Sequence, residues 1–425
     1  MKVEEVFTPN EVPTVTYVTR EEHRLEEMLR DAIGMKNTVA SISGPSKSGK
    51  TVTLNKVIDS DFVINLSGSN IKSIIDLWRQ IFAWIGEPIE VTKTSDTGFE
   101  IGIKARGGGE VAIPLIAKGK AEAEASGGLS HASGENRTVP IDPYEVIAKE
   151  IGESEFLIFI DDFHYIEKSV QKEIAQCIKT LSERGVNFCL ASVPHRSDDA
   201  VRANSELRGR LAAVDFSYWE EGELTKIAVQ GFDALNLDIS NDVIYKLAKE
   251  SSGSPQLMQL LCRNLCQEVQ IRERQKERAK IDIDGKKLYQ ILERASQFAN
   301  FSSILRAMHS GPKIRGSERK QFEFIDKSKG DVYRAILLAI RMDPRALTFK
   351  YDDILERVRS VCNGESPTGS SITSSLSQME EIAAASSGDT IIDWDEDVLT
   401  IVEPYFLFYL RCSSKIEQLH GGGHL

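Results

Sequence analysis

Apolar residues in the first half of the chain gather in five short, nearly continuous runs, and amphipathic stretches separate these runs. The runs are "TVASIS", "FVINLS", "FLIFI", "NFCLAS" and "AAVDFS". Between the third and fourth, Val170, Ile174, Ile178 and Leu181 recur at helical spacing, and Gly185 is placed to end that helix. Strands that are apolar throughout and alternate with helices are typical of a parallel sheet covered on both faces. The pattern predicts an α/β fold.

One segment, residues 95–137, interrupts this alternation. Apolar residues alternate at Phe99, Ile101 and Ile103, "GGG" is suited to a turn, and a second alternating run follows at Val111, Ile113 and Leu115. We expect a β-hairpin inserted in the α/β core. Such a hairpin is either a surface feature without a binding role or a contact with another protomer or a partner protein.

The rest of the chain is predicted to contain only helices up to about residue 310 and to combine helices with strands after that. Residues 219–310 are predicted to be helical throughout, and the mixed charges of "IRERQKERAK" predict a solvated helix face with internal ion pairs. From about residue 313, "DVYRAILLAI", "YDDILERVRSVC" and "SSITSSLSQMEEIAAA" are amphipathic helices, and "TIIDWDEDVLTIV" predicts two short strands around an acidic turn. Three helices followed by a two-stranded ribbon is the order of a winged helix.

The stretch "GPSKSGKT" directly follows the first apolar run and precedes the helical "KTVTLNKVI". It satisfies G-x-x-x-x-G-K-[ST], in which glycines let several backbone N–H groups point at one phosphate. Lys50 would neutralise β- and γ-phosphate oxygens, and the Thr51 hydroxyl would bind Mg²⁺. The start of the helix adds partial positive charge. The residues expected to hold ATP here are Gly44, Pro45, Ser46, Lys47, Ser48, Gly49, Lys50, Thr51 and Val52.

A phosphate loop requires an acidic site at the end of another strand, and "FLIFIDDFHYI" supplies one. The buried strand carries Asp161 and Asp162 to the carboxyl edge of the sheet, where ligands of open α/β sheets bind. Asp161 is expected to hold Mg²⁺ through water. Asp162 is expected to orient or deprotonate the water that attacks ATP, because phosphoryl transfer depends on positioning and charge.

The order of these motifs resembles the AAA+ ATPases, and in particular their signal-transducing relatives, the STAND class. "TYVTREEHRLEEML" is similar to the Arg-Glu box that precedes the phosphate loop in those proteins, which implies that Arg20 lies near the nucleotide, although Thr19 stands where many relatives have Gly. "CLASVPHR" ends the fourth strand where the family has a sensor residue. The resemblance implies Ser192 in that role, with His195 as the second choice.

Two further segments carry the resemblance. "NSELRGRL" resembles the AAA+ segment that offers an arginine finger to a neighbouring subunit, which implies Arg208 or Arg210 as that finger. "SSGSPQLMQLLC" resembles the Gly-x-Pro element of the STAND lid through Gly253 and Pro255, but Gln256 stands where many AAA+ lids have an arginine. The implied domains are an N-terminal arm, a P-loop core containing the insert, a helical lid and a winged helix, at 1–18, 19–218, 219–312 and 313–425.

The charge and composition of the chain restrict the classes of partner that it can bind. The formal net charge is −12, and no Lys or Arg occurs between Arg359 and Arg411, so the predicted winged-helix face would repel DNA phosphates. Nucleic acid could reach the chain only through another surface, such as the basic run "PKIRGSERKQFEFIDKSK". No signal peptide or membrane-length apolar stretch is visible, and Cys262 and Cys266 fit buried reduced thiols. We expect a cytoplasmic protein without a membrane partner.

The leading hypothesis is a slow ATPase of AAA+/STAND type that forms homo-oligomers on ATP binding and signals to a separate protein partner. Family analogy sets this in bacterial stress or antiviral defence. The alternative is a DNA-transaction ATPase, similar to origin-binding initiators or transposition regulators. A third reading keeps the nucleotide site but treats the chain as a scaffold without meaningful hydrolysis.

Overall fold

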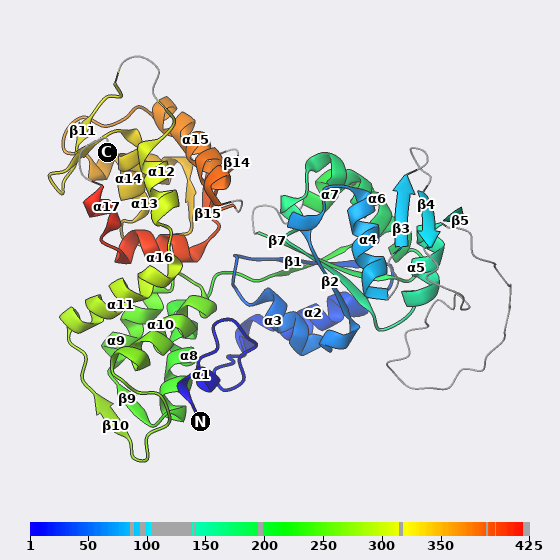
Figure 1. The fold of residues 1–425 in the computed structure, drawn as a ribbon, viewed down its shortest axis with the longest axis horizontal. Coiled ribbons are helices and arrows are strands. Elements are labelled where there is room, and N and C mark those ends of the chain that lie inside the picture. The colour runs from blue at the N-terminus through cyan, green and yellow to red at the C-terminus, as the bar shows by residue number, and fades with distance from the viewer. Residues whose placement is uncertain are drawn as a thin grey trace. The chain divides into compact units, whose positions relative to one another are not determined.

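The computed structural model describes residues 1–85, 89–93, 99–103, 138–139, 142–193, 199–313, 318–387, 390–395 and 397–419. The chain forms two compact units (Figure 1). The first unit consists of Met1–Arg20, Ser46–Gly49 and Tyr218–Leu425, and the second unit consists of Glu21–Pro45 and Lys50–Ser217. None of the helices in the described ranges combines the length and apolar character needed to cross a membrane.

The second unit is built on a parallel five-stranded sheet in the order β2-β6-β7-β1-β8. The strands are β1 (Val39–Ser43), β2 (Val63–Ser67), β6 (Leu157–Asp161), β7 (Asn187–Ser192) and β8 (Leu211–Asp215). They coincide with the five apolar runs, which confirms the predicted α/β class. Strand β7 lies between β1 and β6, so the strand that leads into the phosphate loop and the strand that carries the acid pair are separated by one neighbour.

Helices cover both faces of this sheet. Along β6, Ile158 and Ile160 join the core shared with α4 (Ile74–Ile85), α5 (Pro143–Ile151) and α6 (Lys168–Ser182). The alternate residues Leu157 and Phe159 join the core shared with α2 (Leu25–Gly34) and α3 (Lys50–Val57). Because successive strand residues face opposite sides, a strand buried on both sides is apolar throughout.

Only part of the inserted segment lies within the described residues. A strand does form at β4 (Phe99–Ile103), but it pairs antiparallel with β3 (Ile89–Lys93) and, on its other edge, with β5 (Thr138–Val139). The predicted second strand at 111–115 lies outside the described residues. The local alternation located β4 correctly, whereas its partners depend on pairings that a local pattern does not encode.

In the first unit, the N-terminal arm forms part of a helical core. Its α1 (Val3–Val6) precedes Phe7, whose ring packs edge-on against Phe232, with the ring centroids 5.3 Å apart. A Cβ on Gly231 would lie 2.2 Å from Cε1 of Phe7, so this contact requires glycine. The core includes α8 (Glu221–Ala234), α9 (Asn241–Glu250), α10 (Pro255–Glu268) and α11 (Gly285–Ala299), and α10 buries Cys262 and Cys266 as expected.

The prediction of unbroken helix over 219–310 is wrong at "IRERQKERAK". Helix α10 ends before Gln270, which has φ of 61°, and the chain continues as a loop into β10 (Ala279–Ile281). This strand pairs in parallel with β9 (Leu237–Ile239). Arg278 forms its ion pair with Asp233, at 2.9 Å, instead of with a glutamate one helical turn away. Pairing with a distant strand overrides the local charge pattern.

The C-terminal module, which we define as α12 (Ser302–Ser310) to α17 (Lys415–Gln418), has its own apolar core. Its central elements are α13 (Val332–Ile340), β13 (Thr348–Lys350), α14 (Tyr351–Val361), α15 (Gly369–Ser387), β14 (Ile392–Asp395) and β15 (Val398–Ile401). The sheet order is β13-β15-β14. Strand β13 is one that the sequence pattern did not predict. Helix α16 (Pro404–Cys412) follows.

Charged side chains connect α9 to this module within the first unit. The carboxylate of Glu250, at the end of α9, forms ion pairs with Arg345 and with Arg411, whose Nε lies 3.2 Å from Oε2. Burial alone would raise the pKa of Glu250, but the two guanidinium groups outweigh it and hold this pKa below its ordinary value.

Candidate functional site

The loop between β1 and α3 has the backbone of an anion-binding turn. Lys47 has φ of 60° and Gly49 has φ of 97°, so two left-handed residues alternate near the loop tip. Such alternation turns successive N–H groups toward one point. That φ would strain any other residue at position 49, although no atom lies within 4 Å of a Cβ added to Gly49. The glycine is therefore required by backbone conformation and not by crowding.

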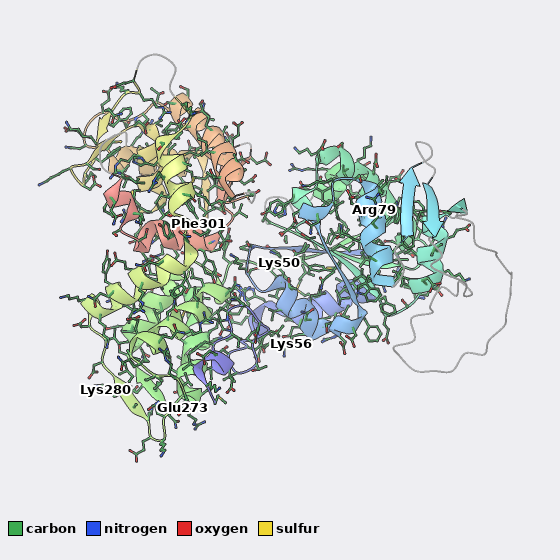
Figure 2. The ribbon with its side chains drawn as sticks, viewed as in Figure 1. Lys50, Lys56, Arg79, Glu273, Lys280 and Phe301 are labelled. Atoms are coloured by element: carbon green, nitrogen blue, oxygen red, sulfur yellow. The ribbon has the colours of Figure 1, made fainter. Side chains whose placement is uncertain are left out.

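Lys50 is the first residue of α3 and is only 8% exposed. Its Nζ donates hydrogen bonds to the carbonyl oxygens of Gly44 and Pro45, both at 2.8 Å. Burial lowers the pKa of Lys50, and the negative charges of Asp161 and Asp162 oppose this effect. The predicted lysine and acid pair therefore lie close enough for their charges to interact. Figure 2 labels Lys50 and, further along the same helix, Lys56.

The acid pair sits at the end of β6 in a constrained backbone. Asp161 is the last residue of β6, and its Oδ1 accepts a hydrogen bond of 2.9 Å from the backbone N–H of Asp162. Asp162 has φ of 54°, which costs about 1–2 kcal/mol in a residue other than glycine. This bond and this conformation together fix the direction in which the chain leaves the strand.

Gly68 allows the acid pair its position, and sequence reasoning missed it. It follows the last residue of β2, and a Cβ at this position would lie 2.3 Å from the backbone oxygen of Asp162 and 3.1 Å from that of Asp161. The backbone of the neighbouring strand end therefore occupies the space of a side chain. The only signal in the sequence is a glycine directly after an apolar run, in "INLSG".

Ser192 lies where the resemblance places a sensor residue. It ends β7 opposite Ser43 of β1, it is 6% exposed, and its carbonyl oxygen accepts a 3.0 Å hydrogen bond from the N–H of Gly44. Its strand lies between the loop strand and the strand of Asp161. The backbone of Ser192 thus fixes the first residue of the phosphate loop. His195 lies outside the described residues.

The donor set fits a magnesium ion. Thr51 and Val52 follow Lys50 in the first turn of α3, and Thr51 contributes a hydroxyl. Asp161 contributes a carboxylate from the edge of the same sheet. Hydroxyl and carboxylate oxygens are hard ligands of the kind Mg²⁺ prefers, and Mg²⁺ usually takes one or two protein ligands together with phosphate oxygens.

Arg20 lies beside the tip of the phosphate loop within the first unit. Its guanidinium carbon is 5.1 Å from the centroid of the Trp219 ring, and its Nε donates a 2.8 Å hydrogen bond to Glu223. The indole Nε1 of Trp219 in turn donates a 2.8 Å hydrogen bond to the carbonyl oxygen of Ser48. Sequence reasoning identified Arg20 by resemblance but missed Trp219, which connects it to the loop.

The Gly-x-Pro element begins α10 close to the same tryptophan. Pro255 is the first residue of the helix, and the Ser254 side chain caps it by accepting a hydrogen bond from Leu257 N–H. Gly253 has φ of 75°, and a Cβ there would lie 3.2 Å from Cδ1 of Tyr218. The element therefore packs against the residue that precedes Trp219.

The two finger candidates differ in their surroundings. Arg210 forms an ion pair with Glu183, with 2.7 Å between Nη1 and Oε1. Arg208 follows the short 3₁₀ helix Ser205–Leu207 and is exposed. Within the part of the chain that the structure describes, its side chain forms no hydrogen bond or ion pair.

Comparison with known proteins supports the fold. No family model and no curated protein matches this sequence. Among solved structures, the Walker-type ATPase of Pyrococcus abyssi is 13% identical, with a TM-score of 0.51 over 93% of this chain and 96% of that chain. Cdc6p from Pyrobaculum aerophilum is 13% identical, with a TM-score of 0.42 over 98% of each chain. The Orc1 protein of Aeropyrum pernix, solved in complex with DNA, is 14% identical, with a TM-score of 0.44 over 98% of this chain and 96% of that chain.

At this identity, the similarity to the Pyrococcus abyssi protein concerns the fold alone. It spans nearly the whole of both chains, and it agrees with the parallel sheet and the loop found here. The chain therefore has the fold of a P-loop ATPase, as the sequence predicts.

Replacing Gly68 by alanine should displace the acid pair. Because the added Cβ would lie 2.3 Å from the backbone oxygen of Asp162, the two strand ends must separate. We expect Gly68→Ala to lower the free energy of unfolding by about 1–3 kcal/mol, measured by urea denaturation. Gly34→Ala is the control in the same unit, because no atom lies within 4 Å of its added Cβ. Equal stability of the two variants would show that no close approach exists at Gly68.

Proposed function

We propose that this chain binds ATP with Mg²⁺ and hydrolyses it to ADP and phosphate. The observation that carries the proposal is the buried Lys50, bonded to the carbonyl oxygens of its own loop and close to the charges of Asp161 and Asp162. A buried ammonium group beside a nest of N–H groups and two carboxylates is suited to a magnesium-bound triphosphate.

Each residue has a separate task in this scheme. The loop N–H groups and the N-terminus of α3 hold the phosphates, and Lys50 neutralises the β- and γ-phosphate oxygens. Thr51 and Asp161 hold Mg²⁺, which offsets the charge that develops during transfer. Asp162 orients the attacking water and accepts its proton while the water oxygen bonds to the γ-phosphorus and the bond to the bridging oxygen breaks. The left-handed backbone of Asp162 sets the direction from which it acts.

Asp162→Asn separates hydrolysis from binding. An amide has nearly the size of the carboxylate but accepts no proton, so we expect ATP turnover to fall by at least about 100-fold. The dissociation constant for ATP should change by no more than about threefold. Steady-state phosphate release and equilibrium binding of a fluorescent ATP analogue measure the two quantities.

Lysine variants of α3 provide the matched control for this experiment. Lys50→Met should abolish ATP binding, whereas Lys56→Met, on the exposed side of the same helix, should leave it unchanged. If Asp162→Asn altered neither turnover nor binding, the assignment of Asp162 would be wrong. Normal binding with no turnover in the wild type would favour the nucleotide-gated scaffold.

We further propose that turnover depends on assembly, with Arg208 as the finger. The arginine that acts in a neighbouring active site must extend from its own subunit, and Arg208 is exposed while Arg210 is paired with Glu183. A guanidinium at the γ-phosphate stabilises the transition-state charge. Turnover per subunit should therefore rise with protein concentration.

Mixing two inactive variants tests this assignment. Arg208→Ala subunits keep an intact site but offer no finger, whereas Asp162→Asn subunits keep the finger. An equal mixture should recover about a quarter of wild-type turnover per subunit, because half the sites are intact and half of those have a competent neighbour. Arg210→Ala should retain most of its activity. A mixture that stays inactive, or a rate independent of concentration, would contradict a finger at Arg208.

Two targets are candidates for the action of this ATPase: a protein partner and DNA. The resemblance favours a protein partner, in stress or antiviral signalling, and the absence of Lys and Arg from α15 supports an output other than DNA through that helix. One observation favours the DNA-transaction alternative. The loop before β10, together with Lys280 in β10 itself, exposes five basic side chains and two acidic ones, and Figure 2 labels Glu273 in the loop and Lys280 in the strand. The basic residues are Arg272, Arg274, Lys276, Arg278 and Lys280.

Duplex binding through this loop should depend steeply on salt, because each phosphate contact releases counterions. The double variant Arg272→Glu, Lys276→Glu should weaken affinity for a labelled duplex at least about tenfold at low salt. Lys286→Glu, Lys287→Glu, at the exposed start of α11, is the matched control. Fluorescence anisotropy at several salt concentrations measures the affinity. An affinity that the loop variant leaves unchanged would contradict DNA binding by this loop.

A further inference from the structure

The side chain of Lys47, at the tip of the phosphate loop, contacts helix α16 of the C-terminal module. Both belong to the first unit. Nζ of Lys47 forms an ion pair with Oε2 of Glu403 and lies 4.4 Å from the centroid of the Tyr405 ring. The Lys47 side chain is 32% exposed and the Glu403 side chain 16%. The pair is thus partly shielded from water, which strengthens it relative to a surface ion pair.

Glu403 is held in place by a second bond. Its other carboxylate oxygen, Oε1, accepts a 3.0 Å hydrogen bond from the N–H of Tyr405 and so caps the start of α16. The helix itself is anchored by Phe406, Leu407 and Leu410, which are fully buried. The acceptor that meets Lys47 is therefore fixed by a rigid element and not by a mobile side chain.

The loop tip needs such support. Lys47 adopts a left-handed backbone with φ of 60°, which is unfavourable for a residue other than glycine. The next residue is held as well, because the carbonyl oxygen of Ser48 accepts the 2.8 Å hydrogen bond from Trp219. Lys47 is thus held through its side chain and Ser48 through its backbone carbonyl. Both contacts come from residues more than 170 positions away in the sequence.

We propose that Glu403 and Tyr405 are positioning residues that hold the phosphate loop in its anion-binding conformation. The C-terminal module thereby sets the affinity of the site for nucleotide. This inference rests on the proposed function and adds its regulation. Because coupling between two sites is reciprocal, nucleotide in the loop also stabilises the position of α16, so a partner that displaces α16 would weaken nucleotide binding.

A competing account predicts the opposite change in nucleotide affinity. Glu403 brings a negative charge to a loop that receives phosphates, so it could instead compete with the nucleotide for Lys47. Removal of that charge would then tighten binding. The two accounts are separated by the direction of one measured change.

The experiment uses Glu403→Gln in the full chain, because a glutamine oxygen can still accept the capping bond from Tyr405. We expect the dissociation constant for a fluorescent ATP analogue with Mg²⁺ to rise about fivefold to tenfold. Lys47→Met, which leaves the cap of α16 intact, should have a similar effect. The double variant should be no weaker than either single variant, since all three remove the same contact. Charge exchange, Lys47→Glu with Glu403→Lys, should recover at least half of the lost affinity.

Glu417→Gln is the matched control, because it removes the ion pair between Arg341 and Glu417 in the same unit without touching the loop. It should leave nucleotide affinity unchanged. Wild-type protein that binds no ATP would overturn the proposed function itself. Wild-type protein that binds ATP normally, with Glu403→Gln unchanged or tighter, would overturn only the positioning role. The positioning role would also be overturned if the effects of Lys47→Met and Glu403→Gln added up in the double variant.

Discussion

The site depends on a buried ammonium group. An amino group that is 8% exposed must be compensated by acceptors or counter-charges, since an isolated charge in the protein interior is costly. For Lys50 the compensation comes from two carbonyl oxygens of its own loop and from the charges of two aspartates across the sheet edge. That requirement explains why the loop closes back on itself between β1 and α3, and why the acids must end a strand that is close in the sheet although distant in sequence.

The strand order meets this requirement. With β7 between β1 and β6, Ser192 fixes the start of the loop through its carbonyl oxygen while Asp161 ends the next strand. The close approach of Gly68 to the backbone of Asp162 and the left-handed conformation of Asp162 then set the position of the acid pair. The backbone conformations at these two residues therefore position the acid pair, which is why Gly68 matters although it carries no functional group.

The loop tip has a second set of constraints inside the first unit. Trp219 binds the Ser48 carbonyl and carries Arg20 on its ring, while Glu403 and Tyr405 hold Lys47. Trp219 and the C-terminal module thus each contact the tip of the loop, and Arg20 packs on Trp219. Ion pairs of Glu250 with Arg345 and Arg411 connect α9 to the module.

The sequence by itself determined the strands of the sheet, the phosphate loop, the acid pair and most helices, because each depends on local periodicity or on a short motif with fixed spacing. The tertiary structure alone decided the partners of β4, the strand at Ala279–Ile281, the approach of Gly68, and the different surroundings of Arg208 and Arg210. It also brought Glu403 to Lys47, across 356 positions. Contacts of this kind depend on which surfaces meet after the chain has folded, and a local pattern of apolar and charged residues carries no record of them.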